Sequence, residues 1–119
     1  MKAANQVFEE LKSILQPYEE NLTIVHDTAG HYYLNTPAQE TQKKEEFFGA
    51  AQIKKKYVAF HLMPIYYYPE LLNSVSEKLK GSMQGKSCFN FTSVDKTLFQ
   101  ELKALIEASF EKYRTVGKV

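Results

Sequence analysis

Apolar side chains recur at helical spacing near each end of the chain. The first set consists of Val7, Phe8, Leu11, Ile14 and Leu15. This spacing predicts a helix over Ala4–Leu15, because Pro17 disfavours helix at the residue before it. The second set consists of Phe99, Leu102, Ile106, Phe110 and Tyr113. It predicts a helix over Lys96–Tyr113 with Asp95 as its N-cap.

Runs rich in β-branched and aromatic residues lie between these helices. Leu22–Asp27 and His31–Asn35 are separated by Thr28-Ala29-Gly30, which predicts a hairpin whose turn uses the glycine. Phe47–Ile53 and Tyr57–Tyr66 predict a second pair of strands. The segment between the two pairs, Asn35–Glu46, is polar throughout and predicts a long exposed loop.

A two-residue turn at Lys55 and Lys56 would fix the register of the second hairpin. It would pair Ile53 with Val58, Ala51 with Phe60, and Gly49 with Leu62, and would place these six on one face. The opposite face would carry a more polar set: Phe48, Ala50, Gln52, Ala59, His61 and Met63. Pro64 is expected at a strand edge or end.

A further helix and a further strand are predicted before the last helix. Pro69 suits a first helical position and Gly81 suits a C-terminal cap, so the apolar stripe between them predicts a helix over Pro69–Lys80. Residues Lys86–Phe91 alternate and predict a strand. Its phenylalanines, Phe89 and Phe91, would face the helices, and the other side would carry Cys88 and Asn90.

The expected fold is α+β, with elements in the order α-β-β-β-β-α-β-α. Short connections favour an antiparallel sheet of about five strands with helices packed mainly on one face. The length of 119 residues fits a single domain over residues 1–119.

Composition narrows the function classes. The net charge of +1 gives no global attraction to a polyanion, so no nucleic acid is expected as a partner. One cysteine excludes an internal disulfide, which fits a reducing compartment. We find no signal peptide and no run of apolar residues long enough to span a membrane, and therefore expect a cytoplasmic protein.

Two segments carry a resemblance to a known family. They are Phe48-Gly49-Ala50-Ala51-Gln52-Ile53-Lys54-Lys55, followed by Tyr57-Val58-Ala59-Phe60-His61-Leu62-Met63-Pro64, and Met83-Gln84-Gly85-Lys86-Ser87-Cys88-Phe89-Asn90-Phe91. Together with the last helix they resemble the YdhG-like domain-of-unknown-function family of small bacterial proteins, over roughly residues 46 to 113. The resemblance implies helices on an antiparallel sheet and no established reaction.

Some relatives in that family have been described as frataxin-like iron chaperones, so the resemblance also implies iron binding as an alternative function. Iron would call for surface carboxylates, and the candidates are Glu9, Glu10, Glu19, Glu20 and Asp27. Residues 1–42 hold two lysines against six acids, whereas residues 43–119 hold thirteen bases against eight acids. The acidic charge is therefore concentrated in the first third of the chain.

The strand pattern places His61 and Cys88 on the sheet face away from the phenylalanines. A thiol beside an imidazole is one arrangement for nucleophilic catalysis, although a structural cysteine is the commoner outcome. The tyrosine triplet Tyr66–Tyr68 must expose at least one ring. The candidate ligand-binding residues are Phe48, His61, Met63, Tyr67, Cys88 and Asn90.

Three functions follow from these residues and from the family resemblance. We favour a non-catalytic binding or interaction protein, in a homodimer or with an unidentified small molecule or protein as its ligand. Iron delivery is the alternative, and a small enzyme using Cys88 with His61 ranks last. No catalytic residue is assigned, and no cofactor is predicted apart from iron in the alternative.

Two smaller clusters have ordinary explanations. His26, Asp27 and His31 approach one another across the predicted first hairpin, but their spacing matches no established metal motif, so surface histidines are favoured. The lysines at the second hairpin tip and in the loop before it fit a solvated surface that also discourages aggregation. These are Lys43, Lys44, Lys54, Lys55 and Lys56.

Overall fold

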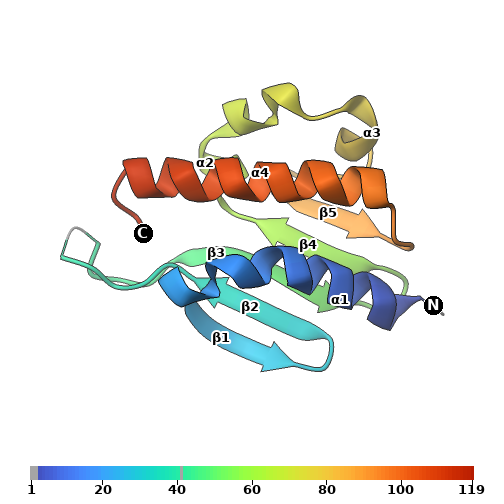
Figure 1. Cartoon of the computed structure of the whole chain (residues 1–119), viewed down its shortest axis with the longest axis horizontal. Helices are drawn as coiled ribbons and strands as arrows, with labels where there is room; N and C mark the ends of the chain where they lie inside the picture. Colours follow the sequence, from blue (N-terminus) through green and yellow to red (C-terminus); the bar gives the residue numbers. More distant parts are fainter. Residues whose placement is uncertain (1–2, 41) are drawn as a thin grey trace.

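Five antiparallel strands form one sheet whose spatial order follows the sequence, β1-β2-β3-β4-β5. The computed structural model describes residues 3–40 and 42–119 (Figure 1), and Met1, Lys2 and Thr41 lie outside the described residues. The strands are β1 (Thr23–Thr28), β2 (His31–Asn35), β3 (Phe47–Ile53), β4 (Val58–Leu62) and β5 (Cys88–Phe91). The predicted α+β class and strand number are confirmed.

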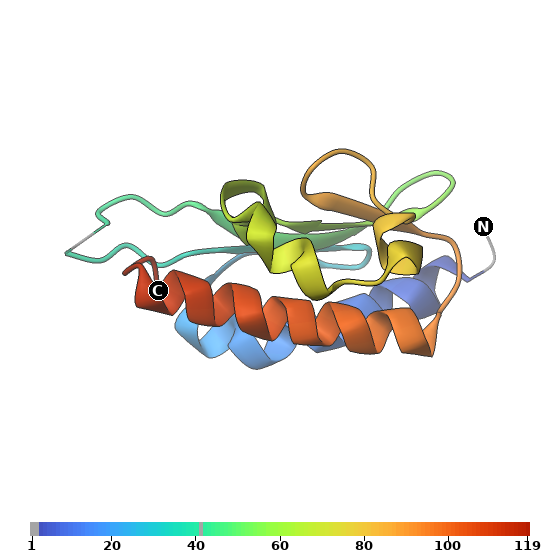
Figure 2. The same cartoon turned by 90° about the horizontal axis from the view of Figure 1, so that it is seen from above.

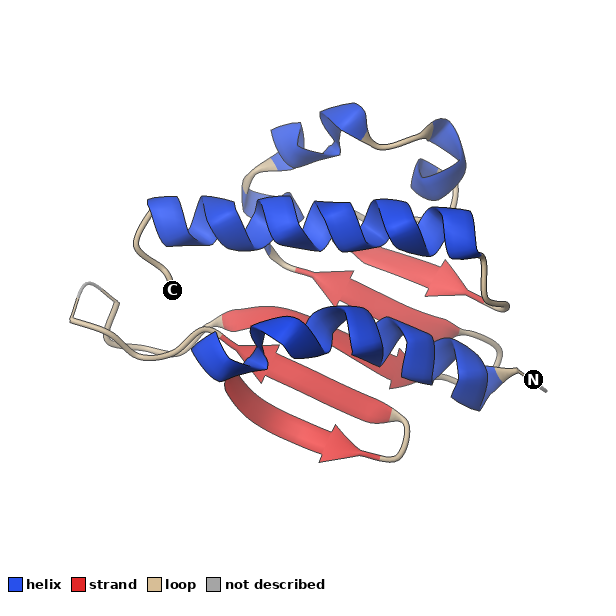
Figure 3. Ribbon diagram, in the orientation of Figure 1, coloured by secondary structure: helices blue, strands red, loops and turns tan. Residues whose placement is uncertain are grey.

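Two long helices, α1 (Ala4–Leu15) and α4 (Lys96–Thr115), cover one face of this sheet (Figures 2 and 3). The Asp95 side chain accepts a hydrogen bond from the Leu98 amide and caps α4 as predicted. Phenylalanines of β4 and β5 are buried in this layer, where Phe91 contacts Phe99 of α4 with ring centroids 5.0 Å apart. The apolar spacing of both helices therefore located the core correctly.

The register of the second hairpin is confirmed pair by pair. Ile53 lies opposite Val58, Ala51 opposite Phe60, and Gly49 opposite Leu62. The Lys54 amide donates to the Tyr57 carbonyl at 2.8 Å, which closes the turn at Lys55 and Lys56. In the first hairpin, Gly30 supplies the expected turn with a φ of 83°. The described residues between β2 and β3, 36–40 and 42–46, form no helix or strand, as the polar composition predicts.

The expected position of Phe48 on the His61 face is wrong. Leu34 pairs with Gly49 but Asn35 pairs with Phe47, so Phe48 is the extra residue of a β-bulge. The bulge turns its ring toward the helices, where it is fully buried against Phe110 and Tyr113. Phe47 takes the place on the opposite face that strict alternation assigned to Phe48.

The single helix predicted over Pro69–Lys80 and the strand predicted through Tyr66 are also wrong. Strand β4 ends at Leu62, and three short helical segments follow: α2 (Pro64–Tyr67), the 3₁₀ helix η2 (Pro69–Ser74) and α3 (Glu77–Lys80). Pro64 and Pro69 each begin a helical segment, since proline suits that position and cannot donate to a ladder. These segments run along the β5 edge of the sheet (Figure 2).

A contact between distant residues explains the break before α3. The Glu101 carboxylate of α4 accepts hydrogen bonds from the Ser76 amide at 2.9 Å and from the Ser76 hydroxyl at 2.8 Å. Ser76 is itself the N-cap of α3 and accepts from the Leu79 amide. Val75 and Ser76 are held extended by these bonds, so the helical stripe through Val75 is interrupted.

The remaining boundaries differ by a few residues at most. Helix α1 and strands β2 and β3 match the prediction, β1 is shifted by one residue, β5 begins at Cys88 and α4 continues to Thr115. Within the described part of the chain, none of the helices combines the length and apolar character that a membrane span needs.

Candidate functional site

The sheet face opposite α1 and α4 carries two rows of side chains in register across four strands. One row is Tyr33, Ala50, His61 and Cys88, and the other is His31, Gln52, Ala59 and Asn90. Both long helices lie on the other side of the sheet (Figure 2). We call these two rows, with Phe47 and with His26 of β1, the open face.

Aromatic and imidazole rings contact one another in an unbroken series across the open face, which we call the ring row. His26 stacks on His31 with ring centroids 4.6 Å apart, and both meet the Tyr33 ring edge to face. Tyr33 stacks on Phe47 at 4.6 Å, and Phe47 contacts His61 at 6.3 Å. Except for His26, which is exposed, all of these rings are half-buried. The open face is thus a prepacked, ring-rich surface.

His61 and Cys88 lie on the same sheet face, as the strand alternation predicts, and the β4–β5 register makes them neighbours. They form a cross-strand pair, and the Cys88 Sγ lies 3.7 Å from the His61 Nε2. The thiol also donates to the Asn90 Oδ1 at 3.5 Å. Burial raises the pKa of the Cys88 thiol and lowers the pKa of the His61 imidazole. The pair is therefore held neutral, as a thiol beside an uncharged imidazole.

Lys54 at the hairpin tip contributes a positive charge to the open face. After burial, its charge is a further cause of the lowered pKa of His61, and it opposes the effect of burial on the Cys88 thiol. The pKa of His31 is lowered chiefly by burial, with smaller contributions from His26 and Lys54. These shifts favour an uncharged surface at neutral pH.

Three of the six predicted ligand-binding residues, His61, Cys88 and Asn90, lie together on the open face. Phe48 is in the core. Met63 is half-buried at the start of α2, and its amide donates to the Phe48 carbonyl. The Tyr67 ring contacts Tyr66 and Lys118.

Sequence reasoning missed Tyr33 and Phe47. For Tyr33 a signal existed, because alternation along His31–Asn35 with Leu34 inward puts Tyr33 outward. For Phe47 there was none, because its position depends on the bulge at Phe48.

The candidate iron ligands are dispersed, and two of them are engaged within the chain. Asp27 forms an ion pair with Lys12 at 2.7 Å, and Glu19 accepts a hydrogen bond from the Tyr32 hydroxyl at 2.5 Å. Glu9, Glu10 and Glu20 are exposed. Among residues 3–40 and 42–119, no three His, Cys, Asp or Glu side chains are grouped as a metal site requires.

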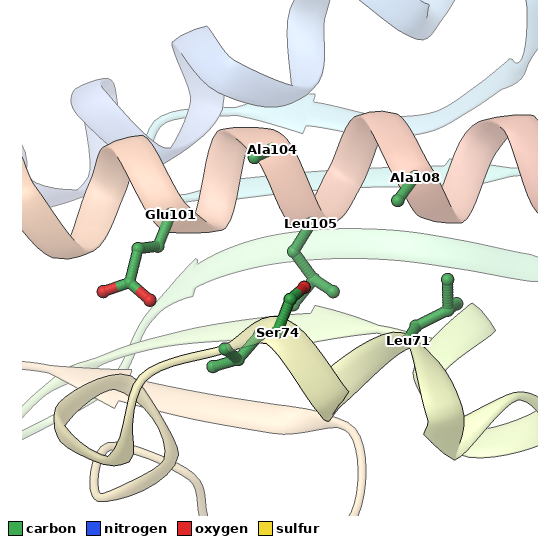
Figure 4. A pocket seen from close by; sticks show the side chains of 7 residues that line it. Leu71, Ser74, Glu101, Ala104, Leu105 and Ala108 are labelled. Carbon is green, nitrogen blue, oxygen red and sulfur yellow. The ribbon is translucent and has the colours of Figure 1, made fainter.

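Two cavities lie in the region of the short helical segments. One, of about 120 Å³, lies between η2 and α4 and includes Ser74, Leu105 and Glu101 (Figure 4). Its carboxylate, Glu101, already accepts the two hydrogen bonds from Ser76. The other, of about 380 Å³, is mainly apolar and is bordered by Tyr66, Met83 and Lys86.

Comparison with known proteins gives no match for this chain among family models, curated proteins or solved structures. The resemblance to the YdhG-like family therefore stays a prediction that rests on the segments quoted above.

Proposed function

We propose that the protein is a non-catalytic interaction module that binds through the open face, and that the occupant of this face is a second copy of the chain. The observation that supports this most directly is the unbroken row of ring contacts from His26 to His61. Half-buried rings that already pack on one another lose little conformational freedom on binding, so they favour association.

The charge distribution supports a second copy as the partner. The two rows contain no acid and no lysine, and Lys54 stands at one end of the hairpin. A two-fold axis that lies in the plane of the interface and runs perpendicular to the strands would pair the uncharged rows and keep the two Lys54 side chains at opposite ends. Two sheets can pack in this way about 10 Å apart, as in other sheet-on-sheet arrangements.

The state of the Cys88–His61 pair favours binding over catalysis. A nucleophilic cysteine needs a lowered thiol pKa, usually from an imidazolium or another cation nearby. Here burial raises the pKa of the Cys88 thiol, and it lowers the pKa of His61 and so disfavours the imidazolium. The pair therefore contributes a compact, uncharged contact to the surface.

Iron delivery remains the alternative proposal, motivated by the family resemblance. The ion pair of Asp27 with Lys12 and the hydrogen bond of Glu19 to Tyr32 give two of the five carboxylates structural partners. Calorimetric titration with Fe(II) tests it directly, and an absence of binding heat would remove it.

Light scattering at increasing protein concentration tests the interaction module. We expect the average mass to rise from that of the monomer to that of the dimer, and Phe47→Glu to hold the chain as a monomer because it puts a charge into the ring row. Val116→Glu, at an exposed apolar position just after α4, is the matched control and should dimerise like the parent. A parent protein that stays monomeric, or a control that dissociates equally, contradicts the proposal.

A further inference from the structure

The ammonium group of Lys118 lies between two aromatic rings and a carboxylate. Its Nζ is 4.6 Å from the Tyr67 ring centroid and 5.1 Å from the Tyr113 ring centroid. The Glu46 Oε2 is 3.5 Å away. Ring faces and an acid around one cation are the elements of an aromatic cage, the arrangement that recognises ammonium ligands.

Three separate parts of the fold build this cage. Glu46 immediately precedes β3, Tyr67 ends α2, and Tyr113 lies in the last turns of α4. The Tyr113 ring is fixed, since it is fully buried and packs on Phe48 and Tyr68. The Tyr113 side of the cage thus exists before any ammonium group arrives, and the exposed Tyr67 ring, which contacts Tyr66, forms the outer side.

A turn after α4 brings Lys118 back over the cage. Gly117 has a φ of 83°, its amide donates to the Arg114 carbonyl, and the Lys118 amide donates to the Tyr113 carbonyl at 2.8 Å. This pair of bonds is a Schellman motif, which uses glycine in the left-handed conformation. The turn holds the Lys118 backbone by main-chain hydrogen bonds, so the Lys118 side chain can leave the cage while α4 stays capped.

We propose that Tyr67, Tyr113 and Glu46 form a binding site for an alkylammonium ion, which Lys118 of the same chain occupies in this structure. The site goes beyond the proposed interaction through the open face, because it shares none of that surface's residues. Tyr67 is 51% exposed, and the Glu46 and Lys118 side chains are 42% and 22% exposed. A ligand can therefore reach the rings once Lys118 moves out.

The site suits a methylated ammonium better than a bare one. A quaternary ammonium donates no hydrogen bonds and is weakly hydrated. It therefore loses little hydration free energy when ring faces take the place of water around it. In this structure the Glu46 Oε2 accepts a hydrogen bond from the Lys118 Nζ at 3.5 Å; toward a quaternary ammonium, which has no N–H to donate, the carboxylate would supply only the opposite charge. Lys118 competes as a tethered ligand, at the high local concentration that a short linker gives.

Titration of the Lys118→Ala variant with choline, followed by calorimetry, tests the site. Removal of a tethered competitor should tighten choline binding by at least about tenfold relative to the parent chain. Lys112→Ala is the matched control: Lys112 lies 4.9 Å from the centroid of one ring, Tyr68, so its removal opens no such cage and should leave choline binding unchanged. In the Lys118→Ala background, Glu46→Gln and Tyr67→Leu should each weaken it again.

Two measurements would overturn the proposal. The first is calorimetry of the Lys118→Ala variant. Equal affinity for choline and for its neutral isostere 3,3-dimethylbutan-1-ol would contradict the proposal, and so would a choline affinity no higher than that of the parent chain. The second needs no variant: in the parent chain, the ε-methylene protons of Lys118 should be shifted upfield in the NMR spectrum by the two rings. Ordinary random-coil shifts for these protons would show that Lys118 does not occupy the cage.

Discussion

The Sγ atom of Cys88 and the Nε2 atom of His61 lie 3.7 Å apart on neighbouring strands, yet the two groups do not activate each other. Burial raises the pKa of the thiol and lowers that of the imidazole, so both remain uncharged near neutral pH. The distance would suit a catalytic pair, but the charge state does not.

Cys88 should therefore react slowly with alkylating agents. A raised pKa leaves less thiolate at neutral pH, and the thiolate is the reacting form. We expect the rate constant with iodoacetamide to be below that of free cysteine, and to rise only at alkaline pH. Denatured protein is the control and should react at the ordinary rate. Faster alkylation of the folded chain would show an activated thiol and would support the small-enzyme hypothesis.

Stability should fall as the pH is lowered from about 7 to about 5. The pKa values of His31 and His61 lie below their ordinary value of 6.5, so the unfolded chain binds more protons than the folded chain in this window. Proton uptake then favours unfolding, and the stability present above pH 6.5 is lost below it. Urea denaturation across this range measures the effect.

The double variant His31→Asn, His61→Asn is the comparison for this pH dependence. Without the two imidazoles, the slope of unfolding free energy against pH between about 7 and about 5 should become smaller. A parent chain that gains stability on acidification would contradict the pKa directions.

Because of the bulge, truncation of two adjacent phenylalanines should cost different amounts of unfolding free energy. Phe48→Ala should cost about 3–5 kcal/mol of unfolding free energy, because the fully buried ring packs on α4. Phe47→Ala should cost less than about 2 kcal/mol, because this ring is only half-buried on the open face. Chemical denaturation of the two variants gives both values. Equal costs, or the reverse order, would place the bulge elsewhere.

Ser109→Ala should leave stability unchanged or raise it by up to about 1 kcal/mol. Ser109 is fully buried in α4, and its hydroxyl has no hydrogen-bond partner among the residues that the structure describes. Alanine removes this polar group and favours helix. Thermal unfolding measures the change, and a loss of more than about 1 kcal/mol would reveal a partner for the hydroxyl.

The part of the open face that sequence predicted is the part where period-two alternation is undisturbed. A turn at Lys55 and Lys56 fixed the β3–β4 register, and alternation along β4 and β5 placed His61 and Cys88 on the same face. The bulge at Phe48 could not be predicted in the same way, because one extra residue carries no turn signal. It moved one aromatic residue into the core and another onto the face.

The two other features that sequence missed depend on contacts between distant residues. Glu101 breaks the helical stripe at Val75 by binding Ser76, 25 positions earlier in the chain. Likewise Glu46 and Lys118 are 72 positions apart, and Tyr67 ends α2, whose earlier residues were predicted to be strand. Local sequence patterns predict neither the Glu101–Ser76 contact nor the Glu46–Lys118 contact, because each forms only when α4 is docked on the rest of the fold.

The most direct test of the open face as the binding surface is NMR of the labelled protein at increasing concentration. We expect the signals that move to be those of Tyr33, Phe47, His61 and Cys88, because these residues meet the second copy. Signals of α1 and of the outer side of α4 should stay in place. Concentration-dependent shifts on the helical side, with none on the sheet face, would contradict the account.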